Sequence, residues 1–440
     1  MAEMKTIEAA RHGWRGAIDI PGDKSISHRS VMFAGLGDMP VHIRNFLHAA
    51  DCLSTVHVMR ALGVRVEFLN ENELIVTGKG LHGLTEPMTV LDAGNSGTTL
   101  RLMMGLLAPQ PFLSVFSGDA SLTRRPMGRV LLPLSAMGAR IYGRNTNNNL
   151  PLTIVPTGEK LRGIHYESPV ASAQVKSAIL LAGLYADAPT TVTEPYVSRD
   201  HTEQMLAGFG VRLERTGTNV TVFPVEEGGY RAPEEITVPG DISSAAYFLV
   251  AASIIEDSSL LLRNVGINPT RTGILDVLTK MGAHITLQNE RTSGGERVAD
   301  LTVETAPLRG VSFGAEIMPR LIDEIPIIAV AALFAEGDTV ITGAGELRVK
   351  ETDRLHAIAT EFQKIAPGSI EEREDGLIIH GKPEMQRAQA SSYGDHRMAM
   401  SLAVLGAAAE GGRIEEPESV NISYPTFFSE MERLSKGGTL

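Results

Sequence analysis

Apolar residues form blocks of helical length along the chain, and each block follows a short alternating segment and a turn. Two of these blocks match closely, IDIPGDKSISHRSVMFAG at residues 18–35 and ITVPGDISSAAYFLVAAS at residues 236–253. Each contains an alternating apolar segment, then Pro-Gly-Asp and serine, and then a run of small and apolar residues. This order predicts a β-strand, a glycine turn and a buried helix.

The same unit recurs four more times with weaker similarity. The further copies begin at Gly94, Ala171, Asp323 and Gly394, and the six copies are spaced 68 to 84 residues apart. Their helices are rich in alanine, glycine and leucine nearly all round, so we expect them to be buried on most sides. Any two α/β units share such features, so the Pro-Gly-Asp pair carries more weight than these four copies.

A second, amphipathic helix follows in most units and ends at a glycine that suits a C-cap. Examples lie in residues 52–64, 129–139, 202–211 and 274–283, and alternating strands follow them. Six units of strand, helix, strand, helix and strands predict an α/β protein of two three-unit halves. The hinges fall near Pro21 and Val238, with a strand over residues 5–20 before the first Pro-Gly-Asp and another over 234–238 before the second. The first domain is then residues 1–21 plus 238–440, and the second is residues 22–237.

Composition narrows the class of protein. The 440 residues are 43% apolar and 21% charged, which excludes disorder for most of the chain. The net charge of −12 argues against binding to nucleic acid or an anionic membrane. With Cys52 as the only cysteine, an intrachain disulfide or cysteine-ligated zinc site is impossible. The longest apolar run, residues 325–335, is too short to span a bilayer, and no signal peptide is evident, so we expect a cytoplasmic location.

Unusual residues lie where the helices of the first half begin. Lys24, Ser25 and Arg29 follow a glycine turn, where free backbone N–H groups and the helix dipole favour an anion. The second unit repeats this chemistry, and Gly97 there would let an anion approach the backbone. Further candidates in this half are Arg125, Ser172, Ala173, Gln174 and Arg199. Hydroxyl and carboxyl groups at helix starts are also ordinary caps, and Arg101, a full turn into its helix, is the cation most expected to be structural.

The second half adds carboxylates. Asp323 lies at the start of an apolar helix, and Glu351 lies between Lys350 and Arg354, which we expect to share a helix face and grip one anion. A carboxyl group among fixed cations can exchange a proton while the cations hold the substrate. Arg397 follows an acid and a histidine at the sixth helix. Arg348 and Asp353 are interpreted as part of a solvated helix with local salt pairs. Together these groups predict a cleft between the halves that binds two small anions, at least one a phosphate, for acid/base group transfer without metal or cofactor.

Nine motifs in order closely resemble the family of 3-phosphoshikimate 1-carboxyvinyltransferases, the 5-enolpyruvylshikimate-3-phosphate synthases. They are PGDKSISHR, LDAGNSGTTLR, TRRPMGRV, SAQVKSAILLAGL, EPYVSRDHTE, PGDISSAA, IDEIP, RVKETDRL and GDHRMAMS, between residues 21 and 401. The resemblance implies an inside-out α/β barrel of two domains, each of three βαβαββ units. It also implies transfer of enolpyruvate from phosphoenolpyruvate to the 5-hydroxyl of shikimate 3-phosphate with release of phosphate, on the route to chorismate and the aromatic amino acids. A monomer is usual by resemblance.

The resemblance assigns roles to residues. Shikimate 3-phosphate would contact Lys24, Ser25, Arg29, Ser172, Ala173, Gln174, Arg199, Asp323 and Lys350. Phosphoenolpyruvate would contact Lys24, Gly97, Arg125, Gln174, Arg354 and Arg397. Asp323 would take the 5-hydroxyl proton, and Glu351, or Lys24 beside the same carbon, would protonate the methylene.

The sequence matches the branch of the family called class II, in which Ala173 replaces a serine and loses one hydroxyl contact. Gly97 is the small residue of the inhibitor-sensitive form, so we expect glyphosate to compete with phosphoenolpyruvate. Two rivals stay open: a sister enzyme that transfers enolpyruvate to a UDP-sugar, and a non-catalytic anion-binding relative. The sister enzymes mostly carry a reactive loop cysteine, whereas Cys52 falls in a predicted helix. A non-catalytic relative would be expected to lack Asp323, Glu351 or Lys24.

Overall fold

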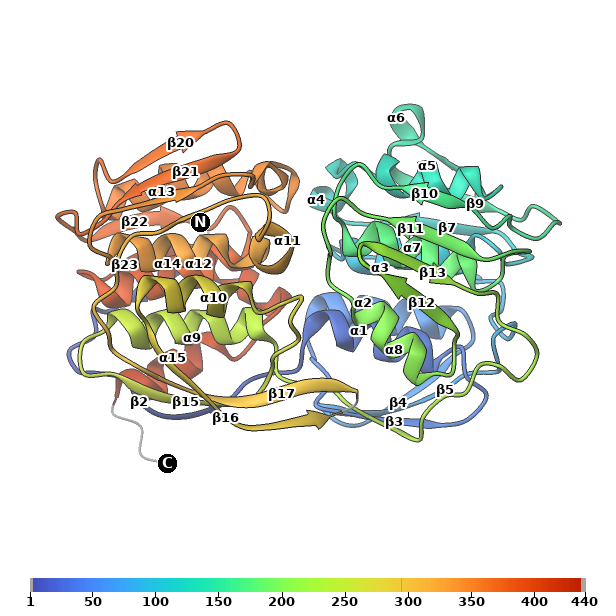
Figure 1. Cartoon of the computed structure of the whole chain (residues 1–440), viewed down its shortest axis with the longest axis horizontal. Coiled ribbons are helices and arrows are strands. Elements are labelled where there is room, and N and C mark those ends of the chain that lie inside the picture. Colours follow the sequence, from blue (N-terminus) through green and yellow to red (C-terminus); the bar gives the residue numbers. More distant parts are fainter. Residues whose placement is uncertain (1–2, 294, 437–440) are drawn as a thin grey trace. The chain divides into compact units, whose positions relative to one another are not determined.

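The computed structural model describes residues 3–293 and 295–436 and divides the chain into two compact units (Figure 1). Unit 1 comprises Met1–Pro21, Pro239–Thr292 and Glu296–Leu440, and unit 2 comprises Gly22–Val238 and Ser293–Gly295. Val238, which the sequence analysis placed with residues 239–440, belongs to unit 2. Its N–H donates to the carbonyl oxygen of Arg44 at 2.9 Å, and its own carbonyl accepts from Asn45 Nδ2 at 2.9 Å.

Unit 2 contains three four-stranded sheets. The first sheet has the spatial order β14 (Glu235–Thr237), β3 (Val41–Arg44), β5 (Glu73–Thr77) and β4 (Arg65–Asn70). The second has the order β6 (Leu91–Asp92), β7 (Ser114–Ser117), β9 (Asn149–Val155) and β8 (Arg140–Gly143). The third has the order β10 (His165–Glu167), β11 (Thr190–Thr193), β13 (Asn219–Val222) and β12 (Leu213–Thr216). In each sheet the first two strands are parallel and the remaining pairs are antiparallel.

Unit 1 also contains three sheets. They are β16 (His284–Ser293), β17 (Glu296–Glu304), β15 (Ser259–Gly266) and β2 (Arg15–Asp19); β18 (Ser312–Phe313), β19 (Asp338–Ile341), β21 (Gly376–His380) and β20 (Ile370–Arg373); and β1 (Met4–Ile7), β23 (Gly412–Glu415) and β22 (Ala388–Ser391). Each again holds one parallel pair. The predicted α/β architecture of six repeated units is confirmed.

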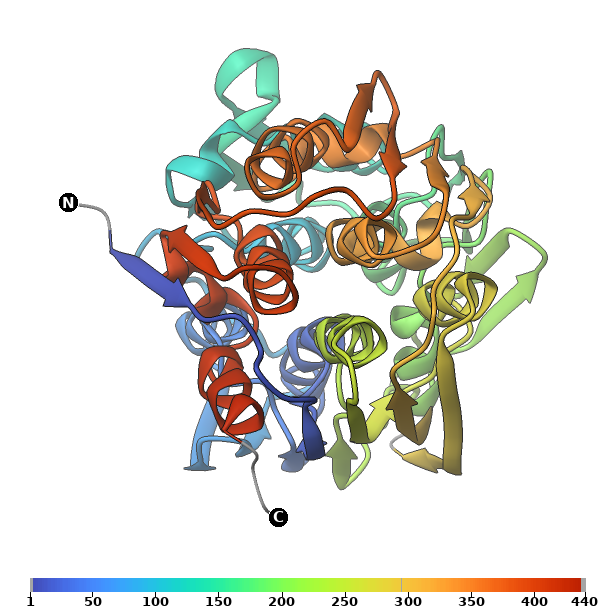
Figure 2. The ribbon, with the colours of Figure 1, turned by 90° about the vertical axis from the view of Figure 1, so that its left-hand side faces the viewer.

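Each of the six repeats contains one apolar helix that is buried on nearly every side. In unit 2 these helices are α1 (Lys24–Ala34), α3 (Gly97–Leu107) and α7 (Ala173–Gly183), and in unit 1 they are α9 (Ile242–Ile254), α12 (Ile325–Leu333) and α14 (His396–Ala408). Figure 2 views unit 1 with α9, α12 and α14 end-on and side by side. All residues of α12 are buried. Burying each of its isoleucine, leucine and valine side chains contributes about 1.5–3 kcal/mol, so this core holds the sheets around it.

The amphipathic helices end at glycines, as predicted. They are α2 (Ala50–Ala61), α5 (Gly128–Ala136), α8 (His201–Gly208) and α10 (Gly273–Met281). The glycines that follow, Gly63, Gly138, Gly210 and Gly282, have φ values of 88°, 101°, 82° and 94°. Residues with a Cβ disfavour this left-handed conformation, which lets the chain reverse into the next strand.

The remaining helical elements include α13 (Arg354–Ile365), which follows α12 in the fifth repeat. The others are α4 (Ala120–Arg124), α6 (Arg144–Asn147), α11 (Met318–Leu321), α15 (Phe427–Ser435) and the 3₁₀ segments η1 (Ile322–Glu324), η2 (Gly345–Val349) and η3 (Pro417–Ile422). None of the helices in residues 3–293 and 295–436 has the length and apolar character needed to cross a membrane.

The strands before the two Pro-Gly-Asp turns pair with strands of the opposite half of the sequence. The single strand expected over residues 5–20 was wrong, because β1 and β2 are separate: β1 pairs with β23 and β2 pairs with β15. In the same way, β14 pairs with β3. The chain therefore passes from one unit's sheet directly into the other unit's buried helix at each turn.

Candidate active site

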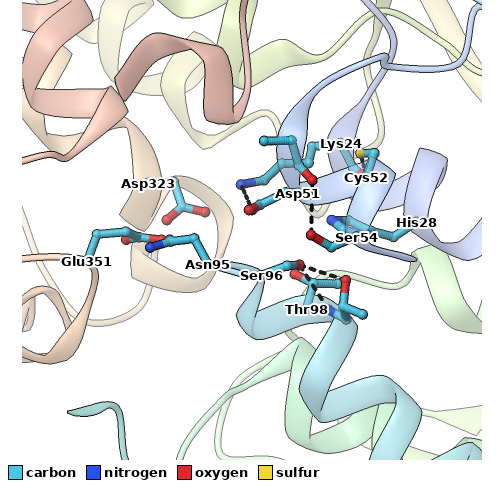
Figure 3. Close-up of polar contacts among 12 residues, drawn as sticks. Lys24, His28, Asp51, Cys52, Ser54, Asn95, Ser96, Thr98, Asp323 and Glu351 are labelled. Atoms are coloured by element: carbon cyan, nitrogen blue, oxygen red, sulfur yellow. Dashed lines mark hydrogen bonds and ion pairs between the residues drawn. The ribbon is translucent and has the colours of Figure 1, made fainter. Parts of the chain in front are cut away.

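Lys24 is the first residue of α1, directly after the Pro-Gly-Asp turn. The turn requires Gly22, since a Cβ there would lie 1.9 Å from the carbonyl oxygen of Asn45. Asp23 caps the helix by accepting the N–H of Ile26 at 2.9 Å. Lys24 Nζ then lies 2.9 Å from Asp51 Oδ2, a contact drawn in Figure 3. Asp51 was not predicted, because its position in the first turn of α2 resembles an ordinary helix-start acid.

Arg29 lies one turn further along α1 and is buried. Its guanidinium donates to Thr202 Oγ1 at 2.7 Å, to Ser177 Oγ at 3.0 Å and to the carbonyl oxygen of Ser25 at 2.8 Å. Because Ser177 lies on α7 and Thr202 on α8, Arg29 ties three helices together. Its contact with substrate stays a prediction.

A buried chain of hydrogen bonds connects α1 with α2 and α3. His28 Nδ1 lies 2.7 Å from Thr55 Oγ1, which lies 2.7 Å from Thr99 Oγ1, and Thr99 donates to Ser96 Oγ at 2.8 Å. Burial, together with the charges of Lys24 and Arg29, holds the pKa of His28 well below its ordinary value of 6.5. The imidazole is therefore neutral near pH 7 and serves as a hydrogen-bonding group within the helix core.

Two guanidinium groups converge on Gly97, the first residue of α3. A Cβ at this position would lie 2.6 Å from Arg101 Nη1 and 3.4 Å from Arg125 Nη1. Arg101 also donates to Gln174 Oε1 at 2.6 Å, and Gln174 Nε2 donates to Thr98 Oγ1 at 2.9 Å. The glycine thus lies at a helix start lined by two cations and an amide, a suitable arrangement for an anionic ligand.

Arg101 therefore belongs to the candidate site, although its place one turn into the helix first favoured a structural role. Residues i and i+4 share a helix face, and this spacing from Gly97 was the signal in the sequence. Arg125 lies in the short loop between the end of α4 and the start of α5. Its Nη2 donates to Asn95 Oδ1 at 2.8 Å and to Ser121 Oγ at 3.2 Å, which directs it toward the start of α3.

The third group of predicted residues lies at the starts of α7 and α8. Ser172 caps α7 ahead of Ala173 and Gln174, and the Ser172 N–H donates to Glu194 Oε1 at 2.9 Å. Arg199 is half-buried on the segment between β11 and α8. The neighbouring Ser198 donates its hydroxyl to Glu194 Oε2 at 2.7 Å.

In unit 1, three cations surround Asp323. Its carboxylate lies 3.4 Å from Arg354 Nη1, 3.7 Å from Lys350 Nζ and 3.8 Å from Arg397 Nη2. Asp323 lies in the 3₁₀ turn η1, and Pro326 near the start of α12 favours such a helix start, because its missing N–H costs no helix hydrogen bond there. The cations stabilise a carboxylate, the form that accepts a proton.

Arg354 is 1% exposed and connects Asp323 with two more acids. Its Nη2 lies 2.6 Å from Glu351 Oε2, and its Nε donates to Asp395 Oδ2 at 2.8 Å. Burial alone would lower the pKa of Arg354, but Asp395 and Glu351 raise it above its ordinary value. The guanidinium is a fixed charge that holds both carboxyl groups in place.

The predicted shared helix face of Lys350 and Arg354 was wrong. Lys350 has an extended backbone after η2, and α13 begins only at Arg354. The two cations meet at Asp323 through the tertiary fold. The salt pairing expected of Arg348 and Asp353 is confirmed, with Nη1 2.9 Å from Oδ2. The two residues do not share a helix, because Arg348 lies in η2 and Asp353 caps α13.

Arg397 is also buried, at the start of α14. Burial would lower its pKa, but Asp323 and further anionic neighbours raise it above the ordinary value. Its Nη1 lies 3.8 Å from Glu324 Oε1, and Glu324 accepts the hydroxyl of Ser243. Arg271 completes this cluster by donating to Ser243 Oγ at 2.9 Å. No pattern in the sequence indicated this connection between segments 81 residues apart.

Comparison with known proteins first defines the class. The fold is shared with the enolpyruvyl transferase NikO from Streptomyces tendae, with a TM-score of 0.78 over 99% of this chain and 98% of that chain at 17% identity. An EPSP synthase from Acinetobacter baumannii is 42% identical, with a TM-score of 0.86 over 98% of both chains.

The sequence then defines the family. A model of the EPSP synthase (3-phosphoshikimate 1-carboxyvinyltransferase) family matches residues 10–431. The 3-phosphoshikimate 1-carboxyvinyltransferases of Bacillus cereus strain 03BB102 and Bacillus thuringiensis subsp. konkukian strain 97-27 are each 52% identical over 434 residues, covering 98% of this chain and 99% of each relative. The chain belongs to the EPSP synthase family, and the predicted resemblance is confirmed.

Proposed function

We propose that this chain transfers the enolpyruvyl group of phosphoenolpyruvate to the 5-hydroxyl of shikimate 3-phosphate and releases phosphate, the EPSP synthase reaction of the shikimate pathway. The observation that carries the proposal is the cluster of Asp323, Glu351 and Arg354, with Lys350 and Arg397 beside it. It combines two carboxyl groups, which can exchange protons with the substrates, with three cations, which can hold the anionic groups of the substrates in place.

In the addition step, Glu351 or Lys24 protonates the methylene carbon of phosphoenolpyruvate, and its C2 becomes oxocarbenium-like. Asp323 takes the proton of the 5-hydroxyl, and the oxygen forms a bond to C2. In the elimination step, the residue that protonated the methylene takes a proton back from the new methyl group, the double bond re-forms, and the C2–O bond to phosphate breaks. Fixed arginines stabilise the phosphate in both steps without reorganising.

The predicted ligand contacts divide between the units. For phosphoenolpyruvate we propose Lys24, Gly97, Arg125 and Gln174 of unit 2 together with Arg354 and Arg397 of unit 1. For shikimate 3-phosphate we propose Lys24, Ser25, Arg29, Ser172, Ala173, Gln174 and Arg199 together with Asp323 and Lys350. The reaction then requires residues of both units to act on one pair of substrates. We further propose a cytoplasmic monomer.

The experiment follows phosphate release from phosphoenolpyruvate, with shikimate 3-phosphate or UDP-N-acetylglucosamine as the acceptor. We expect phosphate release only when shikimate 3-phosphate is the acceptor. Release only with the UDP-sugar would assign the chain to the sister reaction. Binding of either anion without any release would instead indicate a non-catalytic relative.

A further inference from the structure

A buried lysine with two carboxylates lies beneath the starts of α7 and α8 in unit 2. Lys176 is 1% exposed, and its Nζ lies 2.7 Å from Glu203 Oε1 and 3.1 Å from Glu194 Oε2. Glu194 and Glu203 are also buried. Burying a charge costs free energy unless the charge is paired and hydrogen-bonded. The cost of burying these three charged groups suggests that they have a role beyond packing.

The two glutamates differ in what else they contact. Glu194 accepts the Ser172 N–H at 2.9 Å through Oε1, and the Ser198 hydroxyl at 2.7 Å through Oε2. Lys176 adds a bond of 3.4 Å to the carbonyl oxygen of Ser198. The Glu194 carboxylate therefore bridges the segment before α7 and the segment before α8, which are 26 residues apart in sequence. Within the part of the chain that the structure describes, Glu203 accepts a hydrogen bond from neither segment.

We propose that Glu194 is a positioning residue for the sugar phosphate substrate. It fixes the distance between Ser172–Gln174 and Ser198–Arg199, the two segments that carry predicted contacts with shikimate 3-phosphate. Lys176 holds the Glu194 carboxylate in one orientation. This inference rests on the proposed function, since it concerns the same ligand. Without the bridge, the two segments would have to be ordered by the substrate, which would weaken its binding.

The test compares two variants of the full chain that make the same change of charge beside the same lysine. Glu194→Gln retains the size of the side chain but leaves one acceptor oxygen where the carboxylate has two, which now receive Ser172, Ser198 and Lys176. Glu203→Gln is the matched control, since it also removes a carboxylate from Lys176. Binding of shikimate 3-phosphate is measured by calorimetry, and turnover is measured over a range of its concentration.

We expect Glu194→Gln to weaken binding about tenfold, because a hydrogen bond to a buried carboxylate is lost. Its kcat at saturating shikimate 3-phosphate should stay within about twofold of the original chain, since the segments reach their positions once the substrate is bound. We expect a change below about twofold for Glu203→Gln. A purely structural role would instead lower the active fraction, and with it kcat, in both variants.

A milder variant covers the case in which Glu194→Gln does not fold. Ser198→Ala removes a single bond to Glu194 and leaves Lys176 paired, and we expect binding to weaken about threefold. Equal losses in the two glutamine variants, or unchanged binding in both Glu194→Gln and Ser198→Ala, would overturn the inference. Failure of the unaltered chain to bind or turn over shikimate 3-phosphate would instead overturn the proposed function.

Discussion

The two Pro-Gly-Asp turns have the same backbone and different chemistry. Asp23 and Asp241 each cap a buried helix, but the next residue is Lys24 in one turn and Ile242 in the other. In unit 1 the charges near the helix starts are supplied by other segments, on η1, α13 and α14. A repeated fold therefore provides equivalent helix starts, and single residues decide what each start can bind.

The partners of the arginines also differ between the units. In unit 2, Arg29, Arg101 and Arg125 donate to hydroxyl, carbonyl and amide oxygens. In unit 1, Arg354 and Arg397 lie among carboxylates. Neutral partners orient a cation, whereas carboxylate partners place acids beside it. We therefore expect proton transfer to depend mainly on unit 1 and anion binding mainly on unit 2.

The largest expected effect comes from replacing the acid/base groups of unit 1. Asp323→Asn and Glu351→Gln should each lower kcat about 10³-fold, because each removes a proton-transfer group, while shikimate 3-phosphate still binds. Phosphate release and calorimetry on the same samples measure both quantities. A near-normal rate in either variant would remove that residue from the mechanism.

The second effect concerns stability. Asp395→Asn leaves the buried charge of Arg354 without one of its partners and should destabilise unit 1 by about 3 kcal/mol. Trp14, the single tryptophan, is buried in unit 1 and reports its unfolding by urea. Asp51→Asn is the matched change beside Lys24, whose side chain is 16% exposed, and should cost about 1 kcal/mol, followed by circular dichroism. Equal costs would contradict the difference between the units.

The third prediction tests the proposed anion site of unit 2. In Gly97→Ala the new methyl group displaces the flexible end of Arg101 and crowds Arg125. We expect the KM for phosphoenolpyruvate to rise about tenfold, and inhibition by glyphosate to weaken by more. Binding of shikimate 3-phosphate alone serves as the control. If glyphosate at millimolar concentration leaves the unaltered chain fully active, the proposed competition is wrong.

The smallest effect is a pH dependence that belongs to unit 2. His28 stays neutral in the folded state below pH 6.5, whereas the unfolded chain binds a proton there, so stability falls as the pH falls. Between pH 7 and 5.5 the loss from this group is on the order of 1 kcal/mol. His28→Asn should remove that part of the dependence in urea unfolding followed by circular dichroism. If the unaltered chain and the His28→Asn variant show the same pH dependence, His28 is protonated in the folded state and the prediction is wrong.

Much of the fold could be predicted from local pattern. The apolar helices, the glycines after the amphipathic helices and the Pro-Gly-Asp turns each leave a signal within about 20 residues. The division of the chain, with residues 1–21 joining the second half, was also predicted from the repeated turn. The partner strands, β15 for β2 and β3 for β14, were not predictable, because a short alternating segment does not specify its partner strand. Residues 5–20 were misjudged for a related reason: a break between two strands leaves little trace in a pattern of alternation.

The sequence by itself determined the six repeated units, the family and the list of charged residues at helix starts, because these depend on local spacing and motif. Only the tertiary structure decided which charges meet. Asp51 joins Lys24, Arg101 reaches Gln174, Glu194 bridges two segments, and Asp323 gathers three cations. Electrostatic interactions depend on separation in space and on burial, and neither is encoded in separation along the chain.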